Sequence, residues 1–212
     1  MRGMMGAMEL VVFGARGRVG SALLSQALDA GHRVTALVRD ASGMAAHPSL
    51  EVVRGDVLDA QAVTGAMRAG AVVISVLGGE DAIVRGNQKV IAAASARGAR
   101  RILGVSGAGV LQADETHLRS EMPDYPLRFR AIGVAHRAFY DALVVSGLDW
   151  TLVCTPNITP GDVHAPLVAT ANVLPPGTFQ VTTGAVAAFL LREAADGRFL
   201  RSRVGINGFA PS

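Results

Sequence analysis

The chain of 212 residues is 50% hydrophobic and 17% charged, with a formal net charge of +3. This balance is typical of a folded globule with a sizeable core and excludes a disordered protein. The positive charge comes mainly from scattered arginines, so no dense basic run suggests a nucleic-acid partner, and no uninterrupted apolar run is long enough to span a membrane. The single cysteine, Cys154, allows no internal disulfide and favours a reducing cytoplasm.

Short apolar runs alternate with longer amphipathic segments along the whole chain. Residues 1–7 are expected to be a flexible leader, and residues 8–212 a single domain. The repeated strand–helix order predicts a three-layer α/β fold of the Rossmann type: a doubly wound, mainly parallel sheet of six to seven strands with helices on both faces. In chain order, the predicted elements are strand Leu10–Phe13, helix Val19–Ala30, strand Arg33–Val38, strand Glu51–Arg54, helix Ala60–Ala69, strand Val72–Val76, helix Ala82–Arg97, strand Arg101–Val105, helix Ile132–Ser146, strand Trp150–Cys154, helix Gly184–Ala195 and an edge strand Arg203–Ile206.

Two long stretches interrupt this rhythm, at residues 107–128 and 156–181. Both follow predicted strands, so both should emerge at the carboxyl edge of the sheet. Loops of this length in a compact domain are usually functional, and open α/β sheets bind ligands at that edge. We therefore expect both segments to cover a substrate.

The junction of the first strand and first helix carries glycines at Gly14, Gly17 and Gly20. In a dinucleotide-binding turn, the first glycine permits the tight turn, the second lets the backbone approach a pyrophosphate, and the third lets the helix sit close to the strand. The helix N-terminus then offers free N–H groups to phosphate. A tight turn without a ligand is the alternative. The residues predicted to contact the cofactor here are Gly14, Ala15, Arg16, Gly17, Arg18 and Val19.

The tip of the second strand bears on the choice of cofactor. Arg39 stands where an acid usually holds the ribose of NAD, and a guanidinium there can pair with a 2′-phosphate. The neighbouring Asp40 weakens this argument, and the alternative is an exposed Arg–Asp pair on a solvated turn. We favour NADP(H) over NAD(H).

Residues after the third and fourth strands extend the predicted cofactor site. Asp56 is suited to meet the adenine amino group, with Val57 against the ring. The alternative for Asp56 is an acid at the start of a helix. Small residues after the fourth strand would let the chain pass close to the ribose; this segment is Leu77, Gly78 and Gly79.

Taken together, five segments resemble the atypical short-chain dehydrogenase/reductase superfamily. They are GARGRVG from Gly14, VTALVRD from Val34, GDVLD from Gly55, SGLDW from Ser146 and TPNI from Thr155. Within its NmrA-like, NAD(P)H-binding group, the chain is most similar to the biliverdin-IXβ reductase/flavin reductase family, from about Met8 to about Leu191. The resemblance implies NADPH bound across the strand edge, with a flavin or another planar acceptor stacked on the nicotinamide.

The resemblance also implies roles for individual residues. Ser106 stands where the family has a serine near the nicotinamide, and His136 where the group has a histidine. The segment that leads over the nicotinamide matches Pro156, Asn157 and Ile158. In three places the chain departs from its relatives: Asn157 replaces a histidine, Gly43 replaces a second basic residue, and Gly184 replaces a helix-starting acid.

The usual catalytic pair of short-chain dehydrogenases, Tyr-x-x-x-Lys, is absent, since no tyrosine precedes Lys89 at that spacing. His136 and Tyr140 are four residues apart and share a helix face. Either His136 faces the nicotinamide together with Ser106, or it is a half-buried histidine packed beside Tyr140. Without an acid to manage an alkoxide, hydride transfer to an electron-poor acceptor is favoured over alcohol oxidation.

These observations predict an NADPH-dependent reductase of a flavin or related small-molecule acceptor. One alternative is an NmrA-like sensor that binds NADP(H) without turnover. Another is an epimerase or dehydratase that uses bound NAD. The remaining histidines lack metal-ligand spacing, so no metal site is predicted. The oligomeric state, monomer or dimer, is left open.

Overall fold

The computed structural model describes residues 6–161 and 166–209. Within them, eight strands form one sheet in the order β3-β2-β1-β4-β5-β6-β10-β8, and all neighbours are parallel except the antiparallel pair β10–β8. A separate parallel pair joins β7 (Asn157–Thr159) to β9 (Gln180–Thr182). The strands of the main sheet are β1 (Glu9–Phe13), β2 (Arg33–Val38), β3 (Leu50–Arg54), β4 (Val72–Ser75), β5 (Arg101–Gly107), β6 (Trp150–Thr155), β8 (Leu167–Ala171) and β10 (Ser202–Gly208).

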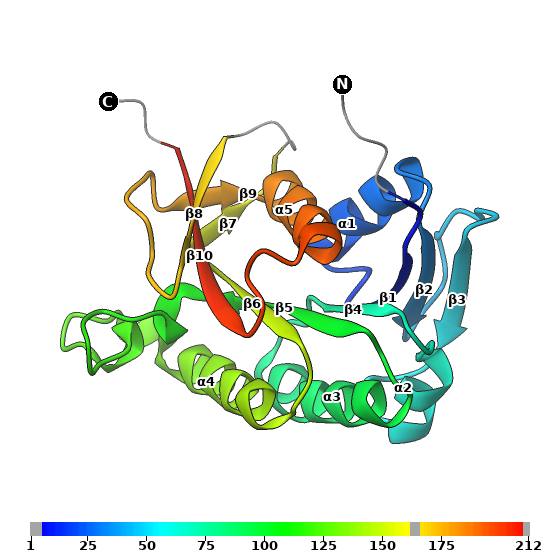
Figure 1. Ribbon diagram of the computed structural model, residues 1–212, viewed down its shortest axis with the longest axis horizontal. Coiled ribbons are helices and arrows are strands. Elements are labelled where there is room, and N and C mark those ends of the chain that lie inside the picture. Colours follow the sequence, from blue (N-terminus) through cyan, green and yellow to red (C-terminus); the bar gives the residue numbers. More distant parts are fainter. Residues whose placement is uncertain (1–5, 162–165, 210–212) are drawn as a thin grey trace.

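Helices cover both faces of the sheet and make three layers (Figure 1). On one face lie α1 (Arg18–Asp29) and α5 (Thr183–Asp196). On the other lie α2 (Ala60–Ala66), α3 (Asn87–Ala96) and α4 (Arg130–Val145). Each face has its own apolar cluster, built mainly from Ala, Val, Leu and Ile. Short helical turns complete the chain: a π-turn at Ala82–Gly86 and 3₁₀ turns at Ala108–Val110, Arg119–Glu121 and Leu127–Phe129.

The predicted doubly wound, mainly parallel sheet is confirmed, with one strand more than expected. The extra strand, β8, lies inside the stretch 156–181 that was interpreted as a loop. Because β8 pairs with β10 from Val204 to Gly208, the prediction that Arg203–Ile206 is an edge strand is wrong. Residues 1–5 of the expected leader lie outside the described residues, whereas Gly6 and Ala7 are exposed and belong to no strand or helix.

Local signals explain where several helices begin and end. Asp59 caps α2 by accepting a hydrogen bond from the Gln61 N–H at 2.8 Å, and Thr182 caps α5 through the Ala185 N–H at 3.2 Å. Gly197 ends α5 with a φ of +64°, a conformation that suits glycine. These caps set the helix positions relative to the sheet.

The position of α4 depends on a missing side chain in β5. A Cβ atom at Gly104 would lie 2.5 Å from the Phe139 ring, so only glycine lets that ring sit on the strand. Phe139 is almost completely buried. This contact draws α4, and with it His136, close to the carboxyl end of β5.

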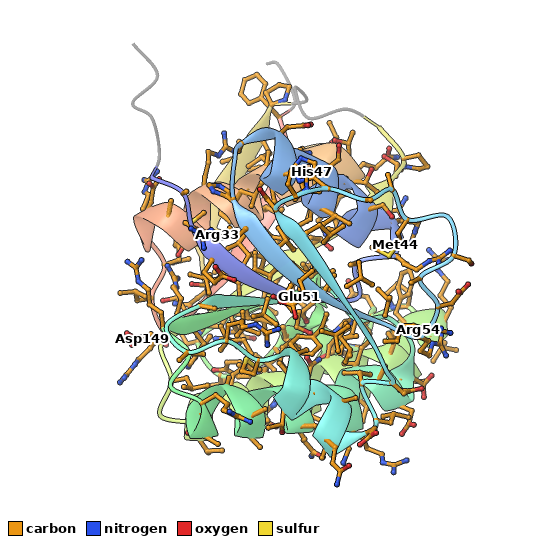
Figure 2. All side chains as sticks on the ribbon, turned by 90° about the vertical axis from the view of Figure 1, so that its right-hand side faces the viewer. Arg33, Met44, His47, Glu51, Arg54 and Asp149 are labelled. Carbon is orange, nitrogen blue, oxygen red and sulfur yellow. The ribbon has the colours of Figure 1, made fainter. Side chains whose placement is uncertain are left out.

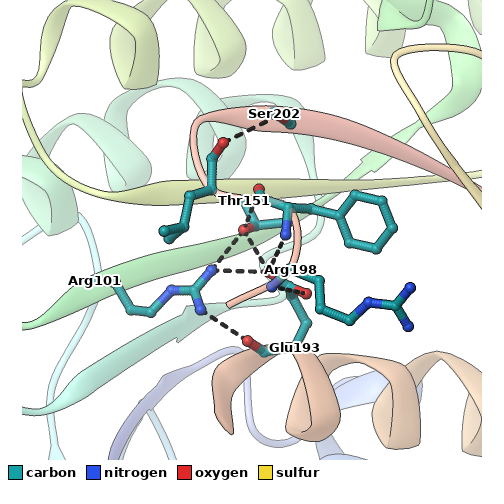
Figure 3. Close-up of polar contacts among 7 residues, drawn as sticks. Arg101, Thr151, Glu193, Arg198 and Ser202 are labelled. Atoms are coloured by element: carbon teal, nitrogen blue, oxygen red, sulfur yellow. Dashed lines mark hydrogen bonds and ion pairs between the residues drawn. The ribbon is translucent and has the colours of Figure 1, made fainter. Parts of the chain in front are cut away.

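A buried polar network ties the amino ends of the strands to α5 (Figure 3). The Arg101 guanidinium forms an ion pair with Glu193 at 3.0 Å and donates to Thr151 Oγ1 at 2.7 Å. Glu193 also accepts from the backbone N–H groups of Arg198 and Phe199. The network lies at the amino ends of the strands, whereas the glycine turn lies at their carboxyl ends, so its role is structural.

The lone cysteine lies in β6. Cys154 is fully buried, and burial strongly raises the pKa of its thiol. The side chain therefore remains a neutral thiol at physiological pH.

Candidate functional site

The glycine turn after β1 sits tightly against its neighbours. Gly14 has a φ of +89°, and a Cβ atom there would lie 2.6 Å from the Val76 carbonyl oxygen at the end of β4. A Cβ atom on Gly20 would collide with the backbone of Gly14 and Ala15. The turn is thus pressed between β4 and α1, as the spacing of the glycines predicts.

Gly17 differs because its surroundings are open. A Cβ atom there would meet only the Gly14 carbonyl oxygen, at 3.2 Å. Gly17 is the N-cap of α1, and no side chain caps the helix. Among the described residues, the N–H groups of Arg18, Val19 and Gly20 have no hydrogen-bond acceptor, since helical bonding begins at Ser21. This first turn offers free donors and a positive dipole end beside open space.

The carboxyl ends of β2 and β3 bring basic residues together next to this turn. Arg39 follows β2, and Arg54 ends β3 opposite Val38. Figure 2 shows Arg54 at one end of the sheet and Arg33, at the start of β2, toward the other. The exposed Arg39 has no side-chain partner among the described residues, so its guanidinium is available to an anion.

The Asp40 carboxylate, in contrast, is already engaged. It accepts a hydrogen bond from the Ser42 N–H at 2.9 Å and lies 3.5 Å from the Arg16 guanidinium. Arg16 also donates to the carbonyl oxygens of Asp40 and Ser42 at 2.6 and 2.8 Å. Hydrogen bonds from Ser42, followed by the charges of Arg16 and Arg54, lower the pKa of Asp40. The acid stabilises its own loop instead of presenting a free carboxylate.

The residues predicted to contact the adenosine lie along the next two strand ends. Asp56 accepts a hydrogen bond from the Leu58 N–H at 2.9 Å, in the turn that precedes Asp59, the N-cap of α2. Val57 and Leu77 converge, because a Cβ atom on Gly86 would lie 2.9 Å from Val57 and 3.3 Å from Leu77. Gly78 and Gly79 follow Leu77, and no protein atom approaches the Cβ positions of either glycine within 4 Å.

Ser106 and His136 lie on the face of the sheet that α4 covers. Ser106 is buried near the end of β5, and its Oγ donates to the Gly107 carbonyl oxygen at 3.3 Å. The His136 ring lies near Gly107, whose Cβ position is 3.4 Å from His136 Cδ2. His136 Nδ1 is buried without a partner among the described residues, and burial lowers the pKa of the ring to about 4. His136 is therefore neutral at pH 7.

The segment after β6 reaches back to the glycine turn. The exposed Asn157 begins β7, and its N–H donates to the Phe179 carbonyl oxygen at 3.3 Å. The Arg18 guanidinium donates to the Ile158 carbonyl oxygen at 3.2 Å. This bond joins the start of α1 to β7, which directly follows Pro156. The bond thus links the predicted pyrophosphate site to the segment that is predicted to lead over the nicotinamide.

The i, i+4 spacing of His136 and Tyr140 does not make them a working pair. Tyr140 packs edge-to-face on Trp150, with 5.9 Å between ring centroids, and the Arg203 guanidinium stacks on its ring at 4.7 Å. The two side chains thus point to different neighbours. The other tyrosine, Tyr125, lies against Gly109 and Gly133, and burial raises its pKa.

Two contributors to the site were missed in the sequence. Arg54 was assigned only as the last residue of a strand, although a basic residue at the tip of the strand beside β2 is a usable signal. Val76 was assigned to the fourth strand, whereas its carbonyl oxygen forms the wall against Gly14. Within residues 6–161 and 166–209, no group of three His, Cys, Asp or Glu side chains is placed to hold a metal ion. No helix in the same ranges is long and apolar enough to cross a membrane.

Comparison with known proteins agrees with this geometry. A family profile described as NAD(P)H-binding matches residues 14–196. A proposed exported protein from Burkholderia pseudomallei is 27% identical, with a TM-score of 0.82 over 94% of this chain and 98% of its own. A proposed NADH-flavin reductase from Streptococcus pneumoniae is 25% identical, with a TM-score of 0.80 over 95% and 100% of the two chains. The anaerobilin reductase of Escherichia coli O157:H7 is 24% identical and shares the fold, with a TM-score of 0.81 over 97% and 100%. The resemblance found in the sequence motifs is confirmed, and the chain belongs to the NAD(P)H-binding family of Rossmann-fold proteins.

Proposed function

We propose that this protein is an NADPH-dependent reductase that delivers hydride to a flavin or a related planar acceptor. The observation that carries the proposal is the combination of free N–H groups at the start of α1 with the unpartnered Arg39 on the neighbouring strand. The first fits a pyrophosphate and the second a 2′-phosphate. The Streptococcus pneumoniae neighbour, described as a proposed NADH-flavin reductase, supports the transfer of hydride from a nicotinamide cofactor to flavin.

A preference for NADPH is supported by the state of Asp40. An acid that selects NAD must offer its carboxylate to the ribose hydroxyls. Here Ser42 and Arg16 occupy that carboxylate, while Arg39 and Arg54 stand beside it with positive charge. The two strand tips together favour a ligand that carries an additional phosphate.

The protonation of His136 favours an acceptor that needs no side-chain acid. A ring with a pKa of about 4 does not donate a proton as imidazolium at pH 7. Tyr140 packs against Trp150 and Arg203 and is not paired with a lysine, so it does not supply the acid that His136 lacks. Bound NADPH would supply hydride, and with one proton from water FMN would become FMNH₂. The chain's contribution is to position the two partners, with Ser106 and His136 lining the approach.

Single-turnover oxidation of NADPH by FMN, followed under anaerobic conditions, tests the proposal. We expect oxidation with NADPH to be faster than with NADH, and absent in Gly17→Val. The Arg33→Ala variant is the matched control, because Arg33 is exposed at the opposite end of β2. If the parent protein does not oxidise NADPH when given either FMN or simple quinones, the reductase proposal is contradicted.

The oxidation assay, together with the cofactor content of the purified protein, separates the alternatives. Tight binding of NADPH without oxidation by any of these acceptors would support the NADP(H) sensor. Purification with tightly held NAD, with no net oxidation, would support an epimerase.

The proposed compartment is the cytoplasm, which maintains a pool of NADPH, and cell fractionation with a tagged chain would test this assignment.

A further inference from the structure

A cavity on the side of α4 is lined partly by the segment 107–128, which the sequence predicts to cover a substrate, and partly by Tyr140 and Arg203, to which the proposed reaction gives no role. It has a volume of about 230 Å³ and lies between α4, the segment that follows β5, and β10. Its lining includes Gln112, Glu115, Leu118, Tyr140 and Arg203. Most ligand pockets are larger, so this cavity suits only a compact molecule.

Arg203 is the unusual member of this lining. Only 8% of its surface is exposed, yet among the described residues no carboxylate forms an ion pair with it. Its guanidinium stacks on Tyr140, and one Nη donates to the Val110 carbonyl oxygen at 2.6 Å. A guanidinium has five N–H donors, and a buried charge is costly unless it is paired. The protein thus meets only part of the bonding capacity of Arg203.

Most other ionisable groups around the cavity have a partner within the chain. Arg137 pairs with Glu121 at 3.3 Å and with Asp141 at 2.9 Å. His117 bonds to Asp114 at 3.0 Å. These groups leave Arg203 as the unmatched cation of the lining.

Glu115 is the remaining charged side chain of the cavity. It is exposed, and among the described residues its carboxylate has no partner. A buried cation and an exposed anion therefore face the same small space. A ligand with one negative charge is attracted by Arg203, whereas a second negative charge on the ligand would be repelled by Glu115.

We propose that this cavity binds a small monocarboxylate, with the ligand carboxylate paired to the guanidinium of Arg203. A planar carboxylate matches the fork of an arginine and supplies the acceptors that the protein lacks there. Dicarboxylates and inorganic phosphate bind more weakly, because Glu115 disfavours their additional charge. The site is separate from the glycine turn and does not depend on the reductase proposal.

The only tryptophan of the chain provides the readout. Trp150 contacts the Tyr140 ring on which Arg203 stacks, so an anion at Arg203 should change the tryptophan fluorescence. We would titrate the full chain with sodium butyrate at constant ionic strength and compare sodium malonate and phosphate. The expected result is a saturable change with butyrate, and a midpoint at least about tenfold higher for the other two anions.

Variants decide whether the response belongs to this cavity. Arg203→Met should abolish the response, and Arg203→Lys should shift its midpoint to higher concentration because lysine lacks the planar fork. Arg198→Met is the matched control, since Arg198 lies over the Phe199 ring outside the cavity, and it should respond as the parent does. Gly17→Val should also respond normally, which would separate this site from the cofactor site.

Three results would overturn the proposal. The first is the absence of any saturable response to butyrate in the parent chain. The second is an unchanged butyrate midpoint in both folded Arg203 variants. The third is tighter binding of malonate or phosphate than of butyrate. If Arg203→Met does not fold, thermal shifts of Arg203→Lys with and without butyrate give the same decision.

Discussion

Replacing Gly17 with valine should severely weaken cofactor binding and leave the fold intact. Gly17 has φ −74° and ψ 170°, an extended conformation that valine adopts readily. The new Cβ would meet only the Gly14 carbonyl oxygen, at 3.2 Å, so a shift of a few tenths of an ångström accommodates it. We expect a loss of no more than about 1 kcal/mol in the free energy of unfolding, within the range of ordinary substitutions.

The effect on binding is much larger. The valine side chain would project into the open space beside the free N–H groups of Arg18, Val19 and Gly20. A hydrogen bond to a charged group contributes about 1.5–3 kcal/mol. Loss of two such bonds to the pyrophosphate removes about 3–6 kcal/mol, or roughly a 10²–10⁴-fold increase in Kd for NADPH.

Calorimetric titration with NADPH, together with thermal unfolding followed by circular dichroism, measures both quantities. Gly20→Ala is the informative contrast, because its Cβ would collide with the Gly14 backbone and should destabilise the fold itself. An NADPH affinity within about threefold of the parent in a folded Gly17→Val protein would refute the assignment of this turn to the pyrophosphate.

Further expectations follow for other parts of the chain. Arg39→Ala should lose about 1–3 kcal/mol of NADPH affinity and little NADH affinity, with Arg33→Ala unchanged; calorimetry measures both, and an equal loss for the two cofactors would contradict recognition of a 2′-phosphate. Because burial lowers the pKa of His136 to about 4, the unfolded chain takes up that proton first as the pH falls below 6.5. Stability should therefore decrease between pH 6.5 and 4, by up to about 3 kcal/mol, and denaturant melts of His136→Gln should lack that share of the decrease. His136→Ala should slow single-turnover NADPH oxidation only modestly, about tenfold, and complete loss of chemistry with intact cofactor affinity would identify His136 as an essential acid. Glu193→Gln should lose about 3 kcal/mol or more in urea melts, because the Arg101 guanidinium would remain buried without its counter-ion, while NADPH affinity stays the same.

The local features of the fold were largely predictable from the sequence. The glycine spacing locates the turn, and the N-cap Asp59 locates the start of α2. Non-local pairing was harder to predict. Leu167–Ala171 is a mostly apolar run of only five residues in a long irregular stretch, and only its alignment with β10 makes it a strand. Such pairing depends on the rest of the sheet, which local patterns do not encode.

The candidate site shows the same division between local and distant contacts. Helical spacing correctly places His136 and Tyr140 on adjacent turns of one helix, but the partners of each come from distant strands. His136 lies near Gly107 of β5, whereas Tyr140 stacks with Trp150 and Arg203. The engagement of Asp40 combines a local partner, Ser42, with a distant one, Arg16, which lies 24 residues earlier in the chain.

The burial of Cys154 has a consequence for the proposed reduction of flavin in air. Reduced flavin released into oxygenated solution generates hydrogen peroxide, which oxidises cysteine through the thiolate. The only cysteine of the chain is fully buried, and burial strongly raises the pKa of its thiol. The chain therefore offers no accessible thiolate to peroxide, and no sulfenic acid that could link two molecules through a disulfide. The proposed flavin reductase would therefore lack the thiol-based route of inactivation by the peroxide that reduced flavin creates.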